Sequence, residues 1–235
     1  MSALKAYLDL CRVSNLPTIW TNVLASGLLA GAPLAPASYG LLAAALSFFY
    51  VAGMSFNDVC DVEHDRLSRP ARPIPSGRVS LRQARILTVV LFATGFALLA
   101  LAPRAIGMAA GVLLLLAIVA YDFHHKRNPY SVFIMAACRF LVFVVTALAL
   151  VGEVPMAVLL AGAAQFLYVV VISLVARYEN GRARPFPFPV VPAMLAGISL
   201  RDGLMMALLY AASWLLAGIA GALLTWAGQR YVRGD

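Results

Sequence analysis

Charged residues are scarce in this chain. Asp, Glu, Lys and Arg make up 12% of its 235 residues, whereas hydrophobic side chains make up 63%. A soluble globular domain normally carries about 25% charged residues. The scarcity therefore excludes an ordinary soluble protein and indicates an integral membrane protein, whose length suits one domain over residues 1–235.

Cysteines are also few. Cys11, Cys60 and Cys138 form no Cys-x-x-Cys pair, so the sequence indicates neither a disulfide framework nor a zinc site. No basic face is interleaved with stacking aromatics, so the net charge of +8 indicates membrane topology and no nucleic-acid partner. The N-terminal stretch lacks the charged start, compact apolar stretch and cleavage site of a signal peptide, so none is expected.

Long apolar runs fill most of the chain. A helix needs about 20 such residues to cross a bilayer. Seven runs come close to this length, at 15–32, 37–57, 83–102, 105–121, 130–151, 154–177 and 203–228. The shorter run 189–200 contains two prolines and is expected to form a re-entrant or interfacial helix. The sequence thus predicts an all-α polytopic membrane protein.

Basic residues are distributed unevenly between the segments that join these runs. If the N-terminus is cytoplasmic, most Lys and Arg fall on the inside, and only Arg104, Arg230 and Arg233 fall outside. The positive-inside rule therefore predicts a cytoplasmic N-terminus and cytoplasmic motif loops, in a bacterial inner (plasma) membrane. Seven spans place the C-terminus outside, although Arg230 and Arg233 favour an eighth crossing that no apolar run supplies.

The stretch NDVCDVEHD at 57–65 ends the second predicted span with four acidic side chains. On a helix, Asn57, Asp61 and Asp65 share one face, and Asp58 lies beside them. Like charges on one face repel and need a compensating cation. Carboxylate oxygens suit Mg²⁺, which usually completes its shell with substrate phosphates. A solvated helix end is the alternative interpretation, but it predicts scattered charges.

The loop that follows, DRLSRPARPIPSGR at 65–78, is rich in arginine and proline. Arginine suits bidentate phosphate contacts, and proline stiffens a loop. Carboxylates for a metal beside arginines for phosphate are the combination that a diphosphate site requires. For any single arginine, anchoring at the cytoplasmic surface is the alternative interpretation.

The combined segment NDVCDVEHDRLSRPARPIPSGRVS resembles the signature loop of the UbiA superfamily of intramembrane prenyltransferases, NDxxDxxxD followed by a basic segment and RPxPSG. The pattern matches residue by residue at Asn57, Asp58, Asp61, Asp65, Arg72, Pro73, Pro75, Ser76 and Gly77. RVSNLPTIWTN in the first span and YDFHHKRNPYS at 121–131 resemble further family segments. The resemblance covers about residues 10 to 185.

The resemblance implies a bundle of seven to nine spans around a central cavity that opens laterally to lipid. It also implies Mg²⁺ ions that bind a polyprenyl diphosphate, whose departure leaves an allylic cation to alkylate a hydrophobic or aromatic acceptor. The implied metal ligands are Asn57, Asp58, Asp61 and Asp65. The implied cavity and phosphate contacts are Arg12, Asn22, Arg72, Tyr121, Lys126 and Arg182. Phe48, Phe49 and Tyr50 either shield the cation or simply pack.

The second aspartate-rich motif of the family is altered here. The corresponding stretch, SLVARYENGRARPFPFPVVPA, holds one acid, Glu179, and three arginines, Arg177, Arg182 and Arg184. Three interpretations are open. Glu179 helps to bind one Mg²⁺, the arginines bind the diphosphate in place of a second metal, or the diphosphate chemistry is lost.

Arg139 lies about ten residues into the fifth predicted span. An ionisable group at this depth is costly and marks a candidate functional residue. It is expected to contact a phosphate or an acceptor carboxylate, with snorkelling or pairing with a neighbour as the alternative. The CR pair at this point, the altered second motif and the ISLRDG stretch together resemble the divergent EboC-like subgroup of the family.

The remaining polar groups carry weaker signals. His64, His124 and His125 show no repeated ligand spacing and are interpreted as polar loop residues. Asp122 is expected to cap its helix or to pair with Lys126 at i, i+4.

Two functions follow from these patterns. The first is a Mg²⁺-dependent prenyltransferase that uses a polyprenyl diphosphate and an aromatic or other small acceptor, and the intact first motif favours it. The second is a UbiA-like protein that binds or transports a lipid or aromatic precursor without prenyl transfer. The altered second motif favours this alternative.

Overall fold

The computed structural model describes residues 3–124, 128, 130–181 and 186–232, and within these ranges every regular element is a helix. The elements run in the order α1 (Ala3–Cys11), η1 (Val13–Asn15), α2 (Leu16–Leu29), α3 (Pro36–Cys60), α4 (Val62–Ser68), α5 (Leu81–Leu99), α6 (Ile106–His124), α7 (Ser131–Leu150), α8 (Met156–Asn180), α9 (Val190–Leu209), η2 (Ala212–Trp214) and α10 (Leu215–Gln229). The predicted all-α architecture is confirmed.

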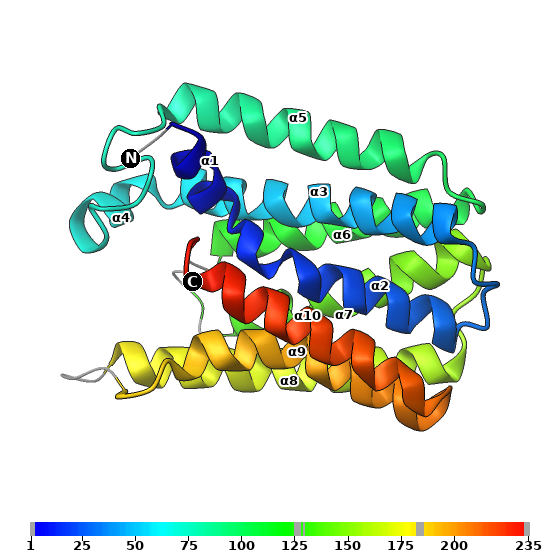
Figure 1. Ribbon diagram of the computed structural model, residues 1–235. Helices are drawn as coiled ribbons and strands as arrows, with labels where there is room; N and C mark the ends of the chain where they lie inside the picture. The colour runs from blue at the N-terminus through cyan, green and yellow to red at the C-terminus, as the bar shows by residue number, and fades with distance from the viewer. Residues whose placement is uncertain (1–2, 125–127, 129, 182–185, 233–235) are drawn as a thin grey trace.

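The long helices α2, α3 and α5 to α10 lie side by side along one bundle axis, and the short helices α1 and α4 lie at one end of it (Figure 1). Six helices are long and apolar enough to cross a membrane: α3, α5, α6, α7, α8 and α9. Helices α2 and α10 are shorter, with 14 and 15 residues. The predicted spans from 37–57 to 154–177 therefore correspond to α3 and α5 to α8.

The C-terminal part of the chain differs from the prediction. The run 189–200 is not a short re-entrant piece, because α9 continues through Arg201 and Asp202 to Leu209. The predicted span 203–228 is wrong, since the chain turns at η2 and returns as α10. Arg201 Nη1 donates to Asp202 Oδ1 at 2.9 Å, and pairing lowers the cost of placing both charges inside a helix.

Helix α10 brings the C-terminal end back to the N-terminal end of the bundle (Figure 1). Gln229 Nε2 donates to Asn15 Oδ1 at 3.0 Å, and Lys5 Nζ donates to the carbonyl oxygen of Tyr231. An arrangement of seven spans would have separated these ends across the membrane. The break between α9 and α10 divides the predicted seventh span into two helices, so that the end of α10 with Arg230 lies near Asn15.

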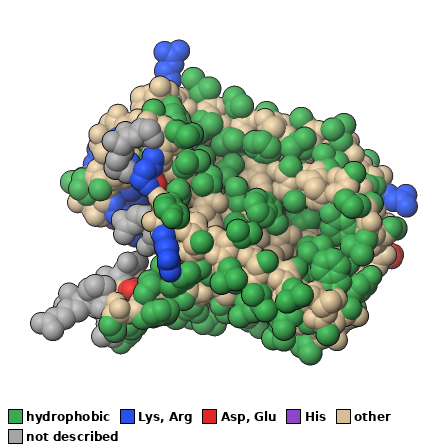
Figure 2. Space-filling model, in the orientation of Figure 1, with side chains coloured by type: hydrophobic (Ala, Val, Ile, Leu, Met, Phe, Trp, Pro, Cys, Tyr) green, Lys and Arg blue, Asp and Glu red, His purple; other side chains and the backbone are tan. Residues whose placement is uncertain are grey.

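The flank of the bundle is covered with hydrophobic side chains, whereas most visible Lys and Arg side chains gather toward the end that carries α1 and α4 (Figure 2). Leu113 and Leu116 of α6, Leu167 of α8 and Leu223 of α10 are each at least half exposed. An apolar surface of this kind suits contact with lipid acyl chains rather than with water. The bilayer is therefore the environment that the fold requires.

Candidate functional site

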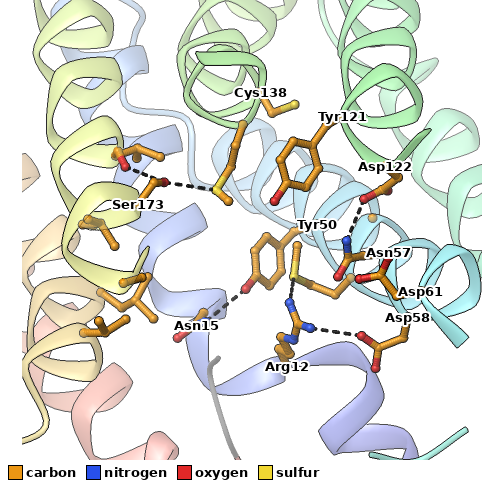
Figure 3. A pocket seen from close by; sticks show the side chains of 18 of the residues that line it. Arg12, Asn15, Tyr50, Asn57, Asp58, Asp61, Tyr121, Asp122, Cys138 and Ser173 are labelled. Atoms are coloured by element: carbon orange, nitrogen blue, oxygen red, sulfur yellow. Dashed lines mark hydrogen bonds and ion pairs between the residues drawn. The ribbon is translucent and has the colours of Figure 1, made fainter. Parts of the chain in front are cut away.

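A cavity of about 1660 Å³ opens into the bundle at the end that carries α4. Its polar lining includes Arg12, Asn15, Asn57, Asp58, Asp61, Asp65, Arg72, Tyr121, Asp122, Arg139, Arg177 and Glu179. Its apolar lining includes Ile19, Leu46, Phe49, Leu114, Ile118, Val142, Val169, Ile172, Val191, Leu195 and Ile198. Figure 3 shows polar side chains from several helices gathered around this space. The cavity therefore joins a charged cluster to an apolar interior.

The acidic motif lies on the cavity wall, as its spacing predicts. Helix α3 ends at Cys60 and α4 begins at Val62, but the helical hydrogen bonds continue across the junction. The amide of Asp61 donates to Asn57 O at 3.0 Å, and the amide of Asp65 donates to Asp61 O at 2.9 Å. The four predicted metal ligands are consequently all buried and all line the cavity.

Two arginines bind the carboxylates of this motif. Arg12 Nη2 lies 3.0 Å from Asp58 Oδ1, while Arg72 Nη1 lies 3.3 Å from the same oxygen and 2.5 Å from Asp65 Oδ2. These side chains are no more than 14% exposed, so solvent screens their attraction weakly. Arg72, which was expected to contact phosphate, and Arg12, which was expected to face the cavity, thus neutralise the aspartates in this structure.

Local backbone geometry directs both arginines into the cavity. Arg12 has a φ of 47° in the left-handed region, which bends the chain between α1 and η1. Such a conformation is uncommon for a residue with a side chain and persists only where contacts enforce it. Arg72 precedes a turn in which Ser76 Oγ donates to Arg72 O at 2.7 Å and Gly77 has a φ of 75°.

The same loop is fixed by its apolar residues. Ile74 and Val79 are buried and pack in one cluster with Ala6 and Leu10 of α1. This packing holds the RPxPSG segment against α1, beside the end of α3. The loop is therefore a positioned part of the cavity wall.

The donor set fits a divalent cation in its chemistry. The carboxylates of Asp58 and Asp65 converge on one positively charged atom, Arg72 Nη1, and Asp61 lines the same wall. Hard cations such as Mg²⁺ prefer carboxylate oxygens. Among the described residues, however, no group of three or more His, Cys, Asp or Glu is close enough to hold a metal. Arg72 occupies the position of a counter-ion between two of the three aspartates.

Asp122 is a cavity residue whose contact the sequence did not reveal. It was expected to cap a helix or to pair with Lys126, which lies outside the described residues. Instead it is 5% exposed at the end of α6, and Asn57 Nδ2 donates to its Oδ1 at 2.9 Å (Figure 3). A carboxylate accepts hydrogen bonds only, so Asp122 fixes which end of the Asn57 amide faces it. The amide oxygen of Asn57, Oδ1, therefore remains available to another partner.

Replacing Asp122 with leucine is expected to weaken Mn²⁺ binding about tenfold in the presence of a methylene bisphosphonate, because groups that orient metal ligands typically contribute this much. Asp122→Asn keeps a carbonyl acceptor for Asn57 and should retain most of the affinity. Electron paramagnetic resonance titration of free Mn²⁺ measures both variants. Equal losses in the two would show that Asp122 acts through its charge, and no loss in the leucine variant would contradict the role.

The remaining predicted residues are divided between the cavity and the interior behind it. Tyr121, Arg139, Arg177 and Glu179 line the cavity. Asn22, which was expected to face the cavity, is fully buried outside its lining, because its amide donates to Asp202 on α9. Lys126 and Arg182 lie outside the described residues.

The cysteines form no disulfide among the described residues. Burial, together with the nearby carboxylate of Asp58, raises the pKa of the Cys11 thiol to about 11. This thiol is therefore protonated at neutral pH and is a poor nucleophile. The chemistry of the cavity rests on its carboxylates and arginines.

The fold and the site define a helical membrane protein with a charged mouth on an apolar cavity. A sequence model of the UbiA prenyltransferase family matches residues 16–232, and the chain belongs to that family. The resemblance carried by the first motif is thereby confirmed. The EboC-like subgroup stays a prediction, because the match is to the family as a whole.

Similar proteins include two archaeal enzymes named digeranylgeranylglyceryl phosphate synthase. The one from Methanococcus vannielii is 38% identical over 94 residues, which are 39% of this chain and 34% of that protein. The one from Methanopyrus kandleri is 37% identical over 129 residues, which are 54% of this chain and 46% of that protein. The matched segments thus span less than half the length of these relatives.

Two solved structures share the fold. One, described as digeranylgeranylglyceryl phosphate synthase in membranes, has a TM-score of 0.67 and 22% identity over 98% of this chain and 88% of that one. A UbiA homologue from Archaeoglobus fulgidus bound to DMAPP and Mg²⁺ has a TM-score of 0.55 and 19% identity, over 96% of this chain and 85% of that one. Both likenesses confirm the UbiA-type helical bundle.

Proposed function

We propose that this chain transfers a prenyl group from a polyprenyl diphosphate to a hydrophobic acceptor that bears an anionic group. The observation that carries the proposal is one cavity in which a buried cluster of aspartates and arginines adjoins an apolar interior. A diphosphate joined to an apolar chain matches that arrangement. The relatives named as digeranylgeranylglyceryl phosphate synthases support it, since their product name describes a prenylated glyceryl phosphate.

The charged mouth is the diphosphate end of the site. Mg²⁺ held by Asp58, Asp61, Asp65 and Asn57 would neutralise the negative charge that develops on the leaving diphosphate. Arg12 and Arg72 already lie within hydrogen-bonding distance of these carboxylates, so a small movement brings their guanidinium groups to phosphate oxygens. Arg177 and Glu179 line the same cavity in place of the altered second motif.

The apolar interior accommodates the prenyl chain and protects the reacting carbon. Transfer breaks the bond between the allylic carbon and a diphosphate oxygen, and the diphosphate leaves with the electron pair. The acceptor nucleophile then bonds to that carbon and releases its proton. Phe49 and Tyr50 both line the cavity and offer aromatic surface to a developing cation, whereas Phe48 is not among the lining residues.

Arg139 lies at the interior side of the cavity and marks the acceptor end. Its guanidinium stacks over Tyr50 with 5.2 Å between the Arg139 Cζ atom and the ring centroid. A cation at this depth favours an acceptor with a phosphate or carboxylate, and the apolar lining favours a lipid or aromatic body. We place the charged mouth on the cytoplasmic side, as the distribution of basic residues predicts.

A second candidate function is binding or transport of such a lipid without prenyl transfer. The altered second motif favours it, because the last turn of α8 and the described residues that follow it contribute only Glu179 as an acidic residue lining the cavity. The described residues also hold no ready cluster of three metal-binding side chains. The two functions differ in whether the diphosphate is consumed.

Turnover in lipid nanodiscs separates these functions. The purified chain is incubated with Mg²⁺, radiolabelled geranylgeranyl diphosphate and either a prenylated glyceryl phosphate or an aromatic carboxylate, and products are resolved by chromatography. We expect a product that disappears with EDTA and in the Asp61→Ala variant. Saturable binding of the diphosphate with no product from any acceptor would support the binding protein instead, and equal turnover by Asp61→Ala would contradict the metal role.

A further inference from the structure

A buried polar network lies behind the cavity, at the centre of the bundle. Asp202 of α9 accepts hydrogen bonds from Thr21 Oγ1 at 2.8 Å and from Asn22 Nδ2 at 2.6 Å, both on α2. Its other oxygen accepts from Arg201 Nη1 at 2.9 Å, and the Arg201 guanidinium also donates to Gln165 Oε1 of α8. Asp202 and Asn22 are both 0% exposed. The network thus joins three helices through a carboxylate that is closed to solvent.

The network ends at the cavity in Arg139. Its Nη1 donates to Thr18 Oγ1 at 3.1 Å and to Asn22 Oδ1 at 3.3 Å, and both acceptors are neutral. Among the described residues, Arg139 makes no ion pair with a carboxylate. Asp202 reaches it only through the Asn22 amide. Arg139 is therefore a partly buried cation that contacts neutral acceptors and, within the described part of the chain, no carboxylate.

The orientation of Asn22 follows from the chemistry of Asp202. A carboxylate accepts hydrogen bonds and cannot donate them, so the Asn22 NH₂ group must face Asp202. The Asn22 carbonyl oxygen then faces Arg139 and fixes its guanidinium against the cavity wall. Arg201 neutralises Asp202, which leaves one positive charge, that of Arg139, uncompensated inside the network. An uncompensated buried charge is costly unless a ligand supplies its counter-ion.

We propose that Asp202 is a positioning residue that acts through Asn22 to hold Arg139 as a fixed, singly positive site for the anionic head group of the acceptor. This inference rests on the proposed function and deepens it, because it adds α9 to the parts of the chain that select the acceptor. Arg201 and Asp202 do not line the cavity, so their effect on the acceptor is indirect.

The test exchanges the carboxylate and the amide in an Asn22→Asp/Asp202→Asn double variant. The exchange preserves the side-chain sizes and the net charge, but it places a carboxylate directly on Arg139. Binding of a fluorescent prenylated glyceryl phosphate, and of the same lipid without its phosphate, is measured in nanodiscs. The wild-type chain is expected to prefer the phosphate form about 10- to 100-fold, as for a hydrogen-bonded charge, and the exchanged variant should lose this preference.

A second variant, Arg201→Gln/Asp202→Asn, keeps the net charge of the network. Because asparagine can both donate and accept, the Asn22 amide can then adopt its flipped orientation. This variant should reduce the preference about tenfold and raise the acceptor KM, with the diphosphate KM unchanged. Inorganic phosphate as a competitor shows whether the site also takes a free anion. Arg139→Gln serves as the reference for a site without its cation.

The outcomes separate this inference from the proposed function. If the wild-type chain binds both lipids equally, the anion site does not exist and the inference fails. If both double variants keep the wild-type preference, or lose affinity for the two lipids alike, Asp202 is only structural and the inference also fails. If no prenyl transfer is found while the preference follows the predicted pattern, the proposed function fails and the positioning role stands.

Discussion

Replacing Asp58 with asparagine is expected to lower the rate of prenyl transfer by about 10²- to 10³-fold, the usual cost of removing one preorganised charged group from a site. Asp58 Oδ1 is the point where Arg12 and Arg72 meet, at 3.0 and 3.3 Å, and its side chain is 5% exposed. Asparagine keeps the size of the side chain but removes a proposed metal ligand and the shared counter-ion of both arginines. Radiolabelled diphosphate turnover measures the loss.

The same substitution should leave diphosphate binding intact when no metal is present. Arg12 and Arg72 are released from Asp58 in the variant and become available to phosphate oxygens. Equilibrium binding of a methylene bisphosphonate in EDTA is therefore expected to be unchanged or tighter. This readout separates the loss of chemistry from a loss of folding, which would weaken binding and turnover together.

Glu63→Gln is the matched control for Asp58. Glu63 lies in the same nine-residue motif, but its side chain is 79% exposed and pairs with Arg66 at 2.8 Å, away from the cavity lining. An exposed pair of this kind contributes little to stability. Turnover by Glu63→Gln should match the wild type. A comparable loss in both variants would show that the motif acts through its overall charge, and the assignment of Asp58 would be wrong.

The acidic motif could be predicted because its geometry is local. Asn57, Asp61 and Asp65 share a face by helical spacing, and the structure keeps that spacing across the junction of α3 and α4. The prediction depended on one helix and one adjoining loop. A single sequence fixes relations of this kind, because backbone hydrogen bonds enforce the spacing whatever the rest of the chain does.

The contacts that the sequence did not reveal join residues far apart in the chain. Asn57 meets Asp122 across 65 positions, and Asn22 meets Asp202 across 180. Neither Asp122 nor Asp202 lies in a local sequence pattern from which its partner could be predicted. For Asp202, the available signal was an Arg-Asp pair between two apolar runs. The predicted runs 189–200 and 203–228 stop on either side of that pair, whereas its mutual neutralisation allows α9 to continue through it.

This difference changes the interpretation of the C-terminal part of the chain. As a short re-entrant helix and one span, residues 189–228 would have left the cavity with a reduced wall. As α9 and α10, they pack on α2 and supply Asp202 to the network behind Arg139. The altered second motif and this intact wall are therefore separate features. The proposed diphosphate end of the cavity departs from the family pattern, while α9 lines the interior with Val191, Leu195 and Ile198 and α10 packs against α9.

Replacing Gly218 with valine is expected to destabilise the bundle by about 3 kcal/mol or more, at the upper end of the usual cost of overpacking. A Cβ atom at Gly218 would lie 2.5 Å from Gly203 Cα and 2.7 Å from Ser199 O. These are backbone atoms of α9, which cannot turn aside as a flexible side chain does. Small residues at such crossings are what allow two membrane helices to approach closely.

Thermal unfolding of the purified chain in detergent measures this effect. A loss of that size should lower the midpoint by on the order of 10 °C for a chain of this length. Because Gly203 follows Asp202, a displaced α9 should also weaken the hold of Asp202 on Asn22 and reduce the preference for a phosphate-bearing acceptor.

Gly40→Val provides the same change at an open position, since nothing lies within 4 Å of an added Cβ atom at Gly40 on α3. Its midpoint should stay near that of the wild type. Similar midpoints for the two variants would mean that α9 and α10 do not meet at these glycines. The packing of α10 on α9 would then not hold Asp202 in position behind Arg139, and the proposed role of Asp202 would lack its structural basis.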